Sequence, residues 1–325
     1  MLIFFRPFTD PFFNIAAEEF FVKHFTEDIC MVWLNTQSVI IGKHQNAFAE
    51  INYPFVHSHN IPVIRRISGG GAVYHDLGNL NFTFIKKTKN ENKVDFSQFT
   101  SVIVGFMQSL GIEVNVNKRN SIFIGNDKIS GHAEHIFHDK VLHHGTLLFE
   151  TDLDMLGKSL ETHKKYESKA MPSVRSMVCN IRPHLRHDMD IQCFAETFVK
   201  WLQGNYPDSR WYELTKIDLS SINKLVIEKY KTWEWNYGYS PAYSFIAEIQ
   251  LVDRLLQISV KVENGKIKQV QNLLEPLNDG ALNVFENLCG VNHREEDFDK
   301  FAEINKLELE LAGIKIVSFT EAFFR

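Results

Sequence analysis

The stretch that distinguishes this chain reads RRISGGGAVYHD and covers Arg65–Asp76. Its three successive glycines, Gly69–Gly71, can adopt positive φ angles and direct their backbone N–H groups toward an anion. Arg66 beside them supplies a planar fork of donors that suits a phosphate or a carboxylate. The stretch is neither a Walker A loop nor a G-x-G-x-x-G turn, because no Gly-Lys-Ser/Thr follows and the next residues are strand-like. On its own it predicts either an anion-binding turn or a glycine-rich turn with two surface arginines.

The segments around this stretch combine helix and strand patterns in mixed order. Asn14–Phe25 has the apolar spacing of a helix, which Asn14 can cap, with Glu18 and Glu19 opposite the apolar arc. Cys30–Leu34 and Ser38–Gly42 resemble a strand pair around a short turn, and Asn79–Ile85 alternates as a half-buried strand does. Because these elements do not form repeating βαβ units, the fold class predicted is α+β rather than a doubly wound parallel sheet.

A second, smaller domain is expected in the C-terminal part of the chain. The strand pattern restarts after about Pro241, and Asn264-Gly265 is a strong signal for a type I′ hairpin turn. The predicted division is residues 1–242 and residues 243–325, the latter a small α/β domain. The polar and basic segment Thr162–Arg175 lacks periodicity and is predicted to be a mobile loop.

Composition excludes several broad classes of protein. The chain has 325 residues, 44% of them apolar and 23% charged, which are globular values. The formal net charge is −5, so the whole chain is not one that coats a polyphosphate, and neither nucleic acid nor membrane is expected as a partner. The four cysteines are widely separated and form no C-x-x-C, which argues against a disulfide framework or a zinc finger. We expect a cytoplasmic protein, because the N-terminal charge follows the apolar stretch and no apolar run is long enough to span a membrane.

A second candidate site is Lys128-Ile129-Ser130-Gly131-His132-Ala133, which follows a tight turn at Gly125–Asp127. A lysine at this place, beside small residues on a strand, can direct its ammonium into a cleft. There it would stabilise negative charge that develops on a transferred acyl or phosphoryl group. Taken alone, the segment is better explained by a solvated hairpin lysine.

The third candidate is Leu142–Leu148, which contains the adjacent histidines His143 and His144. On a strand these two side chains face opposite sides, so only one of them can enter a given site. With three further histidines nearby they suggest a metal, but the spacings match no strong ligand motif, and no metal site is predicted. The chain also lacks a G-x-S-x-G elbow, so serine hydrolysis has no signal.

Taken in order, these motifs resemble lipoate–protein ligase, of the biotin/lipoate protein ligase family. The resemblance covers residues 10 to about 185 and rests on the ordered set of segments Ile41–Asn46, Arg65–Asp76 with Gly78-Asn79, Lys128–Ala133, His143–Leu148 and Ser173–Ser176. It implies an α+β catalytic domain whose sheet is like that of class II aminoacyl-tRNA synthetases. It also implies that residues 243–325 form a C-terminal accessory domain.

The resemblance implies a two-step reaction. The carboxylate of lipoate attacks the α-phosphate of ATP, which is used with Mg²⁺, and forms lipoyl-AMP and pyrophosphate. The ε-amine of an acceptor lysine then displaces AMP. The acceptors implied are lipoyl domains of 2-oxo acid dehydrogenase E2 subunits, the glycine cleavage H protein, or both.

The resemblance also implies the roles of individual residues. Lys128 would be the catalytic contact between the substrate carboxylate and the α-phosphate, and Thr162–Arg175 would be the adenylate-binding loop. The residues implied to bind nucleotide and substrate are Arg66, Ser68, Gly69, Gly70, Gly71, Ala72, Val73, Tyr74, His75, Asn79, Lys128, Gly145 and Thr146. Two positions depart from the family pattern, since Ser121 stands where an aspartate is common and His132 replaces a small polar residue.

Three other functions are alternatives to the ligase. An acyltransferase of the same fold that uses a cysteine thioester is disfavoured, because residues 115–125 contain no cysteine. A transferase that takes preformed lipoyl-AMP without activating ATP remains open, and Ser121 is the position that keeps it so. A non-enzymatic binding module is disfavoured, because a scaffold does not need the paired cations Arg66 and Lys128 around a small acyl site.

Overall fold

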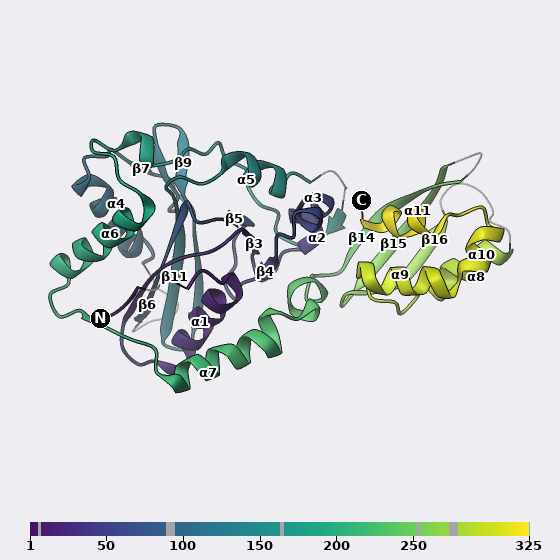
Figure 1. Ribbon diagram of the computed structural model, residues 1–325, viewed down its shortest axis with the longest axis horizontal. Coiled ribbons are helices and arrows are strands. Elements are labelled where there is room, and N and C mark those ends of the chain that lie inside the picture. Colours follow the sequence, from purple (N-terminus) through teal and green to yellow (C-terminus); the bar gives the residue numbers. More distant parts are fainter. Residues whose placement is uncertain (6–7, 89–94, 163–165, 252–254, 273–278, 325) are drawn as a thin grey trace. The chain divides into compact units, whose positions relative to one another are not determined.

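The computed structural model describes residues 1–5, 8–88, 95–162, 166–251, 255–272 and 279–324 (Figure 1). By its contacts the chain divides into two compact units. The first unit contains residues 1–43, 62–158 and 173–231, and the second contains residues 44–61, 159–172 and 232–325. The second unit thus takes in two segments, residues 44–61 and 159–172, that lie between segments of the first unit. The boundary after residue 242 stays a prediction.

A six-stranded sheet forms the centre of the first unit. Its strand β1 lies parallel to β2 and β13, and the remaining neighbours are antiparallel. In spatial order the sheet contains β10 (His132–Phe137), β11 (Lys140–Leu148), β6 (Asn79–Lys87), β2 (Ile29–Leu34), β1 (Leu2–Phe5) and β13 (Arg210–Trp211). Strands β2 and β6 are buried along almost their whole length, because helices cover both faces of the sheet.

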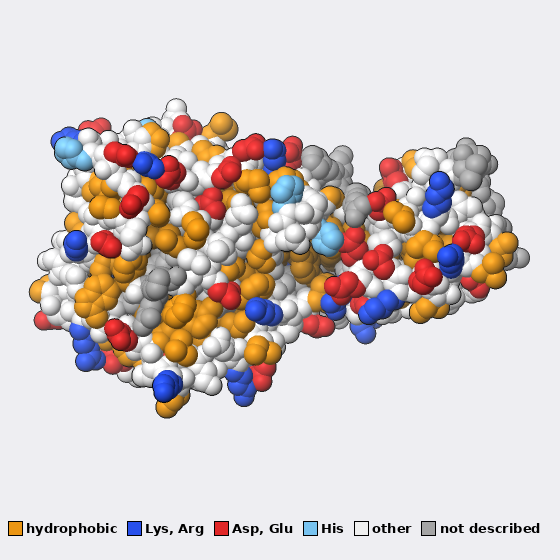
Figure 2. Space-filling model, in the orientation of Figure 1, with side chains coloured by type: hydrophobic (Ala, Val, Ile, Leu, Met, Phe, Trp, Pro, Cys, Tyr) orange, Lys and Arg blue, Asp and Glu red, His pale blue; other side chains and the backbone are white. Residues whose placement is uncertain are grey.

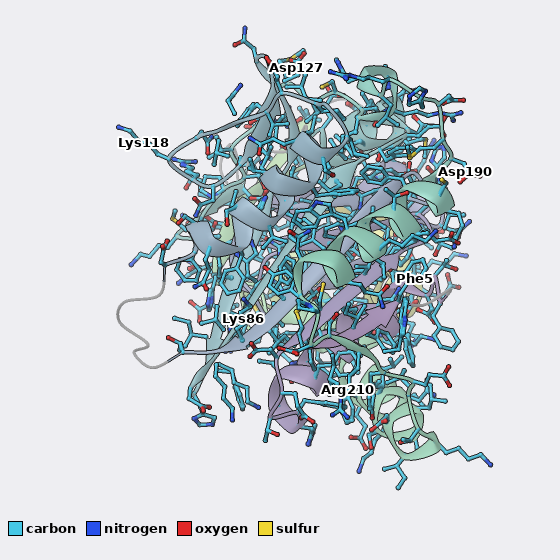
Figure 3. The ribbon with its side chains drawn as sticks, turned by 90° about the vertical axis from the view of Figure 1, so that its left-hand side faces the viewer. Phe5, Lys86, Lys118, Asp127, Asp190 and Arg210 are labelled. Atoms are coloured by element: carbon cyan, nitrogen blue, oxygen red, sulfur yellow. The ribbon has the colours of Figure 1, made fainter. Side chains whose placement is uncertain are left out.

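Helices α4 (Ser97–Ser109) and α6 (Ile191–Asn205) cover one face of this sheet, as Figures 1 and 3 show. Phe82 and Phe84 of β6 project into that side and form one apolar cluster with residues of both helices. Helix α1 (Pro11–His24) packs on the opposite face, where Glu18 bonds to Thr83 of β6. Adjacent residues of β6 therefore serve two different layers, which follows from the alternation of a strand.

Two smaller sheets carry the motif segments in the first unit. In one, β3 (Ser38–Ile41) lies between β4 (Val63–Arg65) and β5 (Val73–His75), and the glycine-rich stretch connects β4 to β5. The other contains β7 (Asn115–Val116), β8 (Ile122–Ile124) and β9 (Asp127–Ser130). The other described helical elements of the unit are a 3₁₀ turn (Arg182–His184), α7 (Lys216–Leu225), a π-helical segment (Val226–Tyr230) and most of α5 (Leu153–Leu160), whose last two residues belong to the second unit.

The second unit is built on a four-stranded antiparallel sheet. Its strands are β12 (Tyr166–Ser168), β14 (Tyr243–Gln250), β15 (Leu255–Glu263) and β16 (Lys266–Asn272). The turn from β15 to β16 has positive φ at both Asn264 and Gly265, so the predicted type I′ hairpin is confirmed. The helices are α2 (Ala47–Glu50), α3 (Tyr53–Ser58), a π-helical segment (Glu234–Gly238), α8 (Asp279–Asn287), α9 (Glu295–Ile304), α10 (Lys306–Leu311) and α11 (Ile316–Phe324).

The predicted start of the first helix was wrong by one turn. Asp10 caps α1 by accepting from the backbone N–H groups of Phe12 and Phe13, and Pro11 occupies the first helical position, where its missing N–H costs nothing. Asn14 lies inside the helix with its amide buried against Asn35. Glu18 and Glu19, expected opposite the apolar arc, are buried as well.

Two further expectations were wrong. The segments predicted to pair around residues 35–37 belong to different sheets, because β2 pairs with β1 and β6 whereas β3 pairs with β4 and β5. The segment Thr162–Arg175, predicted to be a loop, contains β12, which pairs with β14. Residues 163–165 of that segment lie outside the described residues.

No helix in the described part of the chain combines the length and the apolarity that a membrane crossing needs. Acidic and basic side chains are interspersed over the face drawn in Figure 2. That distribution agrees with the small net charge of −5.

Glu19 of α1 ties this helix to the segment after α7. Its carboxylate accepts hydrogen bonds from Lys23 and Lys229, each at 2.6 Å, and from the hydroxyl of Tyr230. Burial opposes ionisation of Glu19, but these hydrogen bonds outweigh burial and lower its pKa below 4.5. The carboxylate therefore stabilises the fold above the unfolded pKa, and this contribution is lost as the pH falls through the lower folded pKa.

We expect Glu19→Gln to lower the free energy of unfolding at neutral pH by about 2 kcal/mol. The difference from the unmodified chain should shrink as the pH falls from about 4.5, where Glu19 of the unfolded state becomes protonated, to below its lower folded pKa, where both states are protonated. Urea unfolding at several pH values measures it. A difference that stays constant down to the acid transition would contradict this assignment.

Candidate active site

The glycine-rich turn between β4 and β5 is held in place by close backbone packing. Gly70 has φ of +85°, a conformation that L side chains rarely adopt. A Cβ atom at Gly42 would lie 2.1 Å from the carbonyl oxygen of Gly70, so only glycine permits this approach of the loop after β3. The backbone N–H of Ala72 donates to Oγ of Ser173 at 2.8 Å, which joins the turn to the motif segment Ser173–Ser176.

Arg66 is buried and directs its guanidinium at the turn itself. Nη2 donates to the carbonyl oxygens of Gly69 and Gly71 at 2.5 and 2.8 Å, and Nη1 donates to that of Ile40 at 3.1 Å. Nε donates to Oγ of Ser68 at 2.9 Å. Burial lowers the pKa of Arg66 to about 10, so the group is still charged at neutral pH. The fork predicted for an external anion thus holds the shape of the glycine turn.

Binding of the carbonyl groups by Arg66 leaves the amide groups of the turn available. Among the described residues, no group accepts a hydrogen bond from the N–H groups of Gly69, Gly70 or Gly71. Gly70 is exposed and its two neighbours are half-buried. Consecutive amides left without a partner in this way are able to bind an anion without a helix N-terminus.

Lys128 lies on β9 and is half-buried rather than at the exposed turn that we expected. Its backbone N–H donates to the carbonyl oxygen of Met177 and its carbonyl oxygen accepts from the N–H of Cys179, which fixes β9 against the chain just after Ser173–Ser176. Burial lowers the pKa of Lys128, and the charge of Arg119 lowers it further. Within the described residues, Nζ donates no hydrogen bond and forms no ion pair.

Contacts along β10 bring the glycine turn and the lysine segment to the same end of the sheet. A Cβ at Gly70 would lie 3.3 Å from Cβ of Ala133, and a Cβ at Gly131 would lie 3.0 Å from Nζ of Lys128. Thr146 of β11 donates its N–H to the carbonyl oxygen of Gly131 at 3.1 Å. Gly145 must be glycine, because a Cβ there would lie 2.5 Å from the ring of Phe82. The motifs that are far apart in sequence are therefore neighbours in space.

A buried polar chain supports the turn from the α1 side of the sheet. Nε2 of His144 is 2.7 Å from Oγ of Ser68, and its Nδ1 is 2.7 Å from Oε1 of Glu18. The same oxygen of Glu18 accepts from Thr83, whose hydroxyl accepts from the indole of Trp33. Sequence reasoning missed Glu18, Thr83 and Trp33. The sequence did show a polar face on the predicted strand Asn79–Ile85, which contains Thr83. That face is buried because helices cover both sides of the sheet, and the sequence alone does not show this covering.

The remaining predicted site residues line the strand that follows the turn. Ala72 and Val73 are half-buried, and Tyr74 and His75 are buried. Burial lowers the pKa of His75 to about 3, so its ring is neutral, and Nδ1 lies 3.1 Å from Asn35. Among the described residues, Nε2 of His75 and Oδ1 of Asn79 have no hydrogen-bond partner. Buried polar atoms of this kind are groups that a bound ligand can satisfy.

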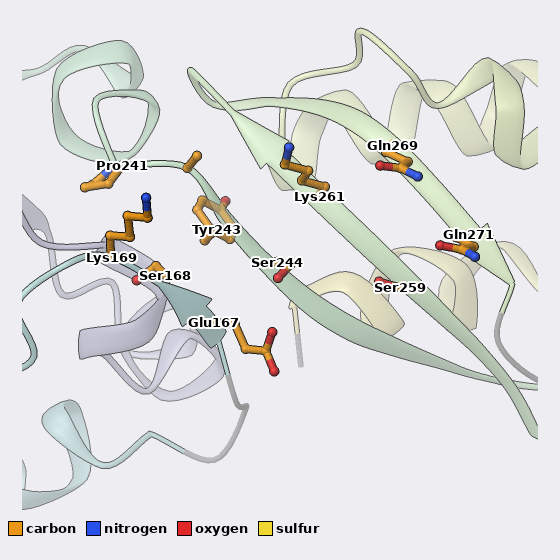
Figure 4. A pocket seen from close by; sticks show the side chains of 11 residues that line it. Glu167, Ser168, Lys169, Pro241, Tyr243, Ser244, Ser259, Lys261, Gln269 and Gln271 are labelled. Carbon is orange, nitrogen blue, oxygen red and sulfur yellow. The ribbon is translucent and has the colours of Figure 1, made fainter.

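A separate groove lies on the second unit, on the sheet formed by β12, β14, β15 and β16 (Figure 4). Its volume is about 490 Å³, and Lys169, Tyr243 and Lys261 are among the residues that line it. Glu167, Ser168 and Lys169 belong to the segment Thr162–Arg175 that was predicted to bind the adenylate, whereas Lys128 and the residues predicted to bind nucleotide and substrate do not line this groove. The described residues also contain no group of three or more His, Cys, Asp or Glu residues that could hold a metal ion.

Comparison with known protein families identifies the family of the first unit. The sequence pattern that defines the lipoyl protein ligase A/B catalytic domain matches residues 10–203. The chain belongs to this family. Family membership confirms the resemblance inferred from the motifs, and the α+β architecture agrees with the structures of other members.

Individual relatives match most of the chain. Lipoate–protein ligase 1 of Staphylococcus aureus is 38% identical over 299 residues, which cover 91% of this chain and 90% of the relative. A solved lipoate–protein ligase A bound with ATP has a TM-score of 0.63 at 26% identity and covers 74% of this chain and all of its own. The bipartite ligase of Thermoplasma acidophilum, described with its E2 lipoyl domain, has a TM-score of 0.62 at 26% identity and covers 73% of this chain and 96% of its own.

Proposed function

We propose that this lipoate–protein ligase joins lipoate to a lysine of an acceptor protein in two steps at one site. In the first step a carboxylate oxygen of lipoate attacks the α-phosphate of ATP, the bond to pyrophosphate breaks and lipoyl-AMP forms. In the second step the acceptor amine attacks the lipoyl carbonyl, an amide forms and AMP leaves. The observation that supports this best is that the backbone N–H groups of Gly69–Gly71 donate no hydrogen bond within the described residues and lie at the same end of the sheet as Lys128. The similar structure of a lipoate–protein ligase A bound with ATP supports ATP as the nucleotide substrate.

The proposed roles follow from the charges that each step must manage. In the first step two anions approach each other, and Lys128 offsets their repulsion as a mobile point charge. The amides of Gly69–Gly71 bind the phosphates, while Arg66 and Ser68 fix the turn that presents them. The residues that we propose to line the nucleotide and substrate are Ala72, Val73, Tyr74, His75, Asn79, Gly145 and Thr146.

Mg²⁺ enters this proposal only as a companion of ATP. The ion usually keeps several waters and binds substrate phosphates with one or two carboxylates. Ser121, where relatives often carry an aspartate, is buried and lacks a carboxylate, and the described residues offer no cluster that could cage a metal. The residues that the structure describes thus form no three-ligand cage for magnesium, and we assign no step to the ion.

Lipoyl domains are the acceptors that we propose, since a relative is described together with its E2 lipoyl domain. An E2 lipoyl domain and the glycine cleavage H protein can be tested in parallel. Each is mixed with the enzyme, ATP, Mg²⁺ and lipoate, and intact-mass analysis then reports the acyl adduct on each acceptor. The cytoplasmic location expected from the sequence stays a prediction.

Pyrophosphate release separates the ligase from its runner-up, a transferase that uses preformed lipoyl-AMP. With ATP, Mg²⁺ and lipoate but no acceptor, we expect about one equivalent of pyrophosphate per enzyme, because the adenylate stays bound until an amine arrives. A chain that releases none, yet lipoylates an acceptor from synthetic lipoyl-AMP, is the transferase. Ser121→Asp is the informative variant in that case, since it restores the carboxylate common in relatives.

A further inference from the structure

His132, which replaces a small polar residue of the family pattern, is the middle of a second polar chain. Its Nε2 lies 2.9 Å from Oγ of Ser130, and its Nδ1 lies 2.8 Å from Nε2 of His143. Nδ1 of His143 lies 3.2 Å from Oε1 of Glu134. The chain thus runs Ser130, His132, His143, Glu134, and it lies on the opposite face of β11 from the chain through His144.

Strand register explains why these four side chains meet. Glu134 of β10 lies directly opposite His143 of β11, and His132, two residues earlier, shares their face. The residue opposite His132 is Gly145, which has no side chain, so the imidazole has room to lean toward His143. The ring of His143 is stacked on Phe99 at 4.8 Å between centroids, which fixes its orientation.

The hydrogen bonds in this chain have one consistent direction. Among the described residues Nδ1 of His143 has no hydrogen bond, but it lies 3.2 Å from Oε1 of Glu134. The negative carboxylate favours the proton of the neutral His143 ring on Nδ1, so Nε2 of His143 accepts. His132 therefore donates from Nδ1, and its Nε2 accepts from the hydroxyl of Ser130. This is the tautomer that a general base requires, with its free electron pair turned toward Ser130 and its N–H bond toward a partner that can stabilise positive charge.

The surroundings of this polar chain bring it near Lys128, and its Ser130 is buried. Ser130 is two residues from Lys128 on β9, and a Cβ at Gly131 would lie 3.0 Å from Nζ of Lys128. His132 is half-buried, with His143 beside it and Phe82 against its edge, and the charges of Lys128 and of His144, which lies on the other face of β11, also act on it. His143 is buried beside Glu134, and the charge of His144 acts on it from the other face. The side chain of Glu134 is 29% exposed, so water can hydrate its charge.

We propose that His132 is the general base of the transfer step, acting through the hydroxyl of Ser130, and that His143 and Glu134 are positioning residues that hold it in the active tautomer. The proposal deepens the ligase function and rests on it. Burial lowers the pKa of His132 well below 6.5, and its neighbours His143 and Lys128 add to this effect, so the ring is neutral and can accept a proton. The negative charge of a bound adenylate next to Lys128 would raise that pKa again.

The chemical need for such a base lies in the acceptor. A lysine amine has a pKa of about 10.4 and reaches the enzyme as an ammonium. One proton must leave before its electron pair can form the C–N bond, and in this proposal that proton passes through Ser130 to His132. The C–O bond to AMP then breaks, its electron pair leaves with the phosphate, and the second proton is lost to water as the amide forms. His132 returns its proton to solvent, which its partial exposure allows.

The test measures the two half-reactions separately. Adenylation is followed as pyrophosphate release from ATP and lipoate, and transfer is followed with synthetic lipoyl-AMP and a lipoyl domain. We expect Glu134→Gln to lower transfer about tenfold further than adenylation near pH 6.5, within the usual range for general-base effects. The deficit should shrink toward about pH 9, where more of the acceptor amine is already neutral. Asp139→Asn, in the turn between the same two strands, is the control that should alter neither half-reaction.

His132→Ala provides an independent check by chemical rescue. Transfer should fall by about 100-fold, and added imidazole should restore part of it while leaving adenylation unaffected. Two results would overturn the proposal: a pH profile of Glu134→Gln that is parallel to that of the parent, or an equal loss of rate in both half-reactions. Either would show that the polar network from Ser130 to Glu134 has only a structural role. Failure of the ligase function itself would look different, because the unmodified enzyme would then fail in adenylation or transfer.

Discussion

Replacing Lys128 with alanine is expected to lower adenylation by about 100- to 1,000-fold, the range seen when one preorganised electrostatic contact to a transition state is removed. The reason is the position of its ammonium, which lies half-buried beside Gly131 and donates no hydrogen bond within the described residues. The fold does not depend on it, so the melting temperature should remain close to that of the parent. Single-turnover pyrophosphate release and thermal unfolding measure the two quantities.

Lys118→Ala is the matched control for this variant. Lys118 is exposed between β7 and β8 and points away from the molecule in Figure 3. Lys118→Ala removes the same charge next to the same small sheet, so a general electrostatic effect on the adenylation rate would appear in both variants. If Lys128→Ala formed lipoyl-AMP at the parent rate, the catalytic role proposed for this lysine would have to move to another residue.

Arg66→Lys is expected to lose most adenylation activity and about 2–4 kcal/mol of unfolding free energy. Lysine keeps the positive charge, but its ammonium cannot span the carbonyl oxygens of Ile40, Gly69 and Gly71 that the guanidinium binds together. Each buried carbonyl left without its donor costs about 1–3 kcal/mol, partly recovered where the turn reaches water. Urea unfolding and the KM for ATP measure the two effects.

The same variant distinguishes two roles for Arg66. If its charge alone offsets the phosphates, as the sequence suggested, the lysine variant should keep substantial activity with a raised KM. If it shapes the glycine turn, as the contacts indicate, activity and stability should fall together. Arg210→Lys is the control, because Arg210 is exposed and bonds only loosely to Glu27 at 3.6 Å. An unfolding free energy of Arg66→Lys equal to that of the parent would rule out the role of Arg66 in holding the shape of the glycine turn.

Much of the candidate site was accessible from the sequence because it is carried by short, local patterns. Three consecutive glycines, a lysine after a tight turn and a His-His-Gly strand are each recognisable without knowing their neighbours. Their order along the chain identified the family, and the Asn264-Gly265 turn identified a hairpin because its conformation is a property of those two residues. The α+β class followed from the mixed order of helices and strands.

What the sequence could not determine was which face of each element would be buried, and against what. Glu18 and Glu19 follow the spacing of an exposed helix face, yet α1 is covered on both sides, by the main sheet and by the segment after α7. Arg66 carries the donors of an anion fork, but only the folded turn shows them bound to the turn's own carbonyl groups.

The family, the candidate site motifs and the local turns could be read from the sequence alone, because they depend on residue type and on spacing within a few positions. The pairing of β2 and β3 with distant strands, and the assignment of His143 and His144 to separate polar chains, came only from the folded structure. It also showed Glu134 to be the residue opposite His143. The physical reason is that hydrogen-bond partners and burial are set by strands and helices that meet across more than a hundred residues of sequence, as Glu18 and His144 do.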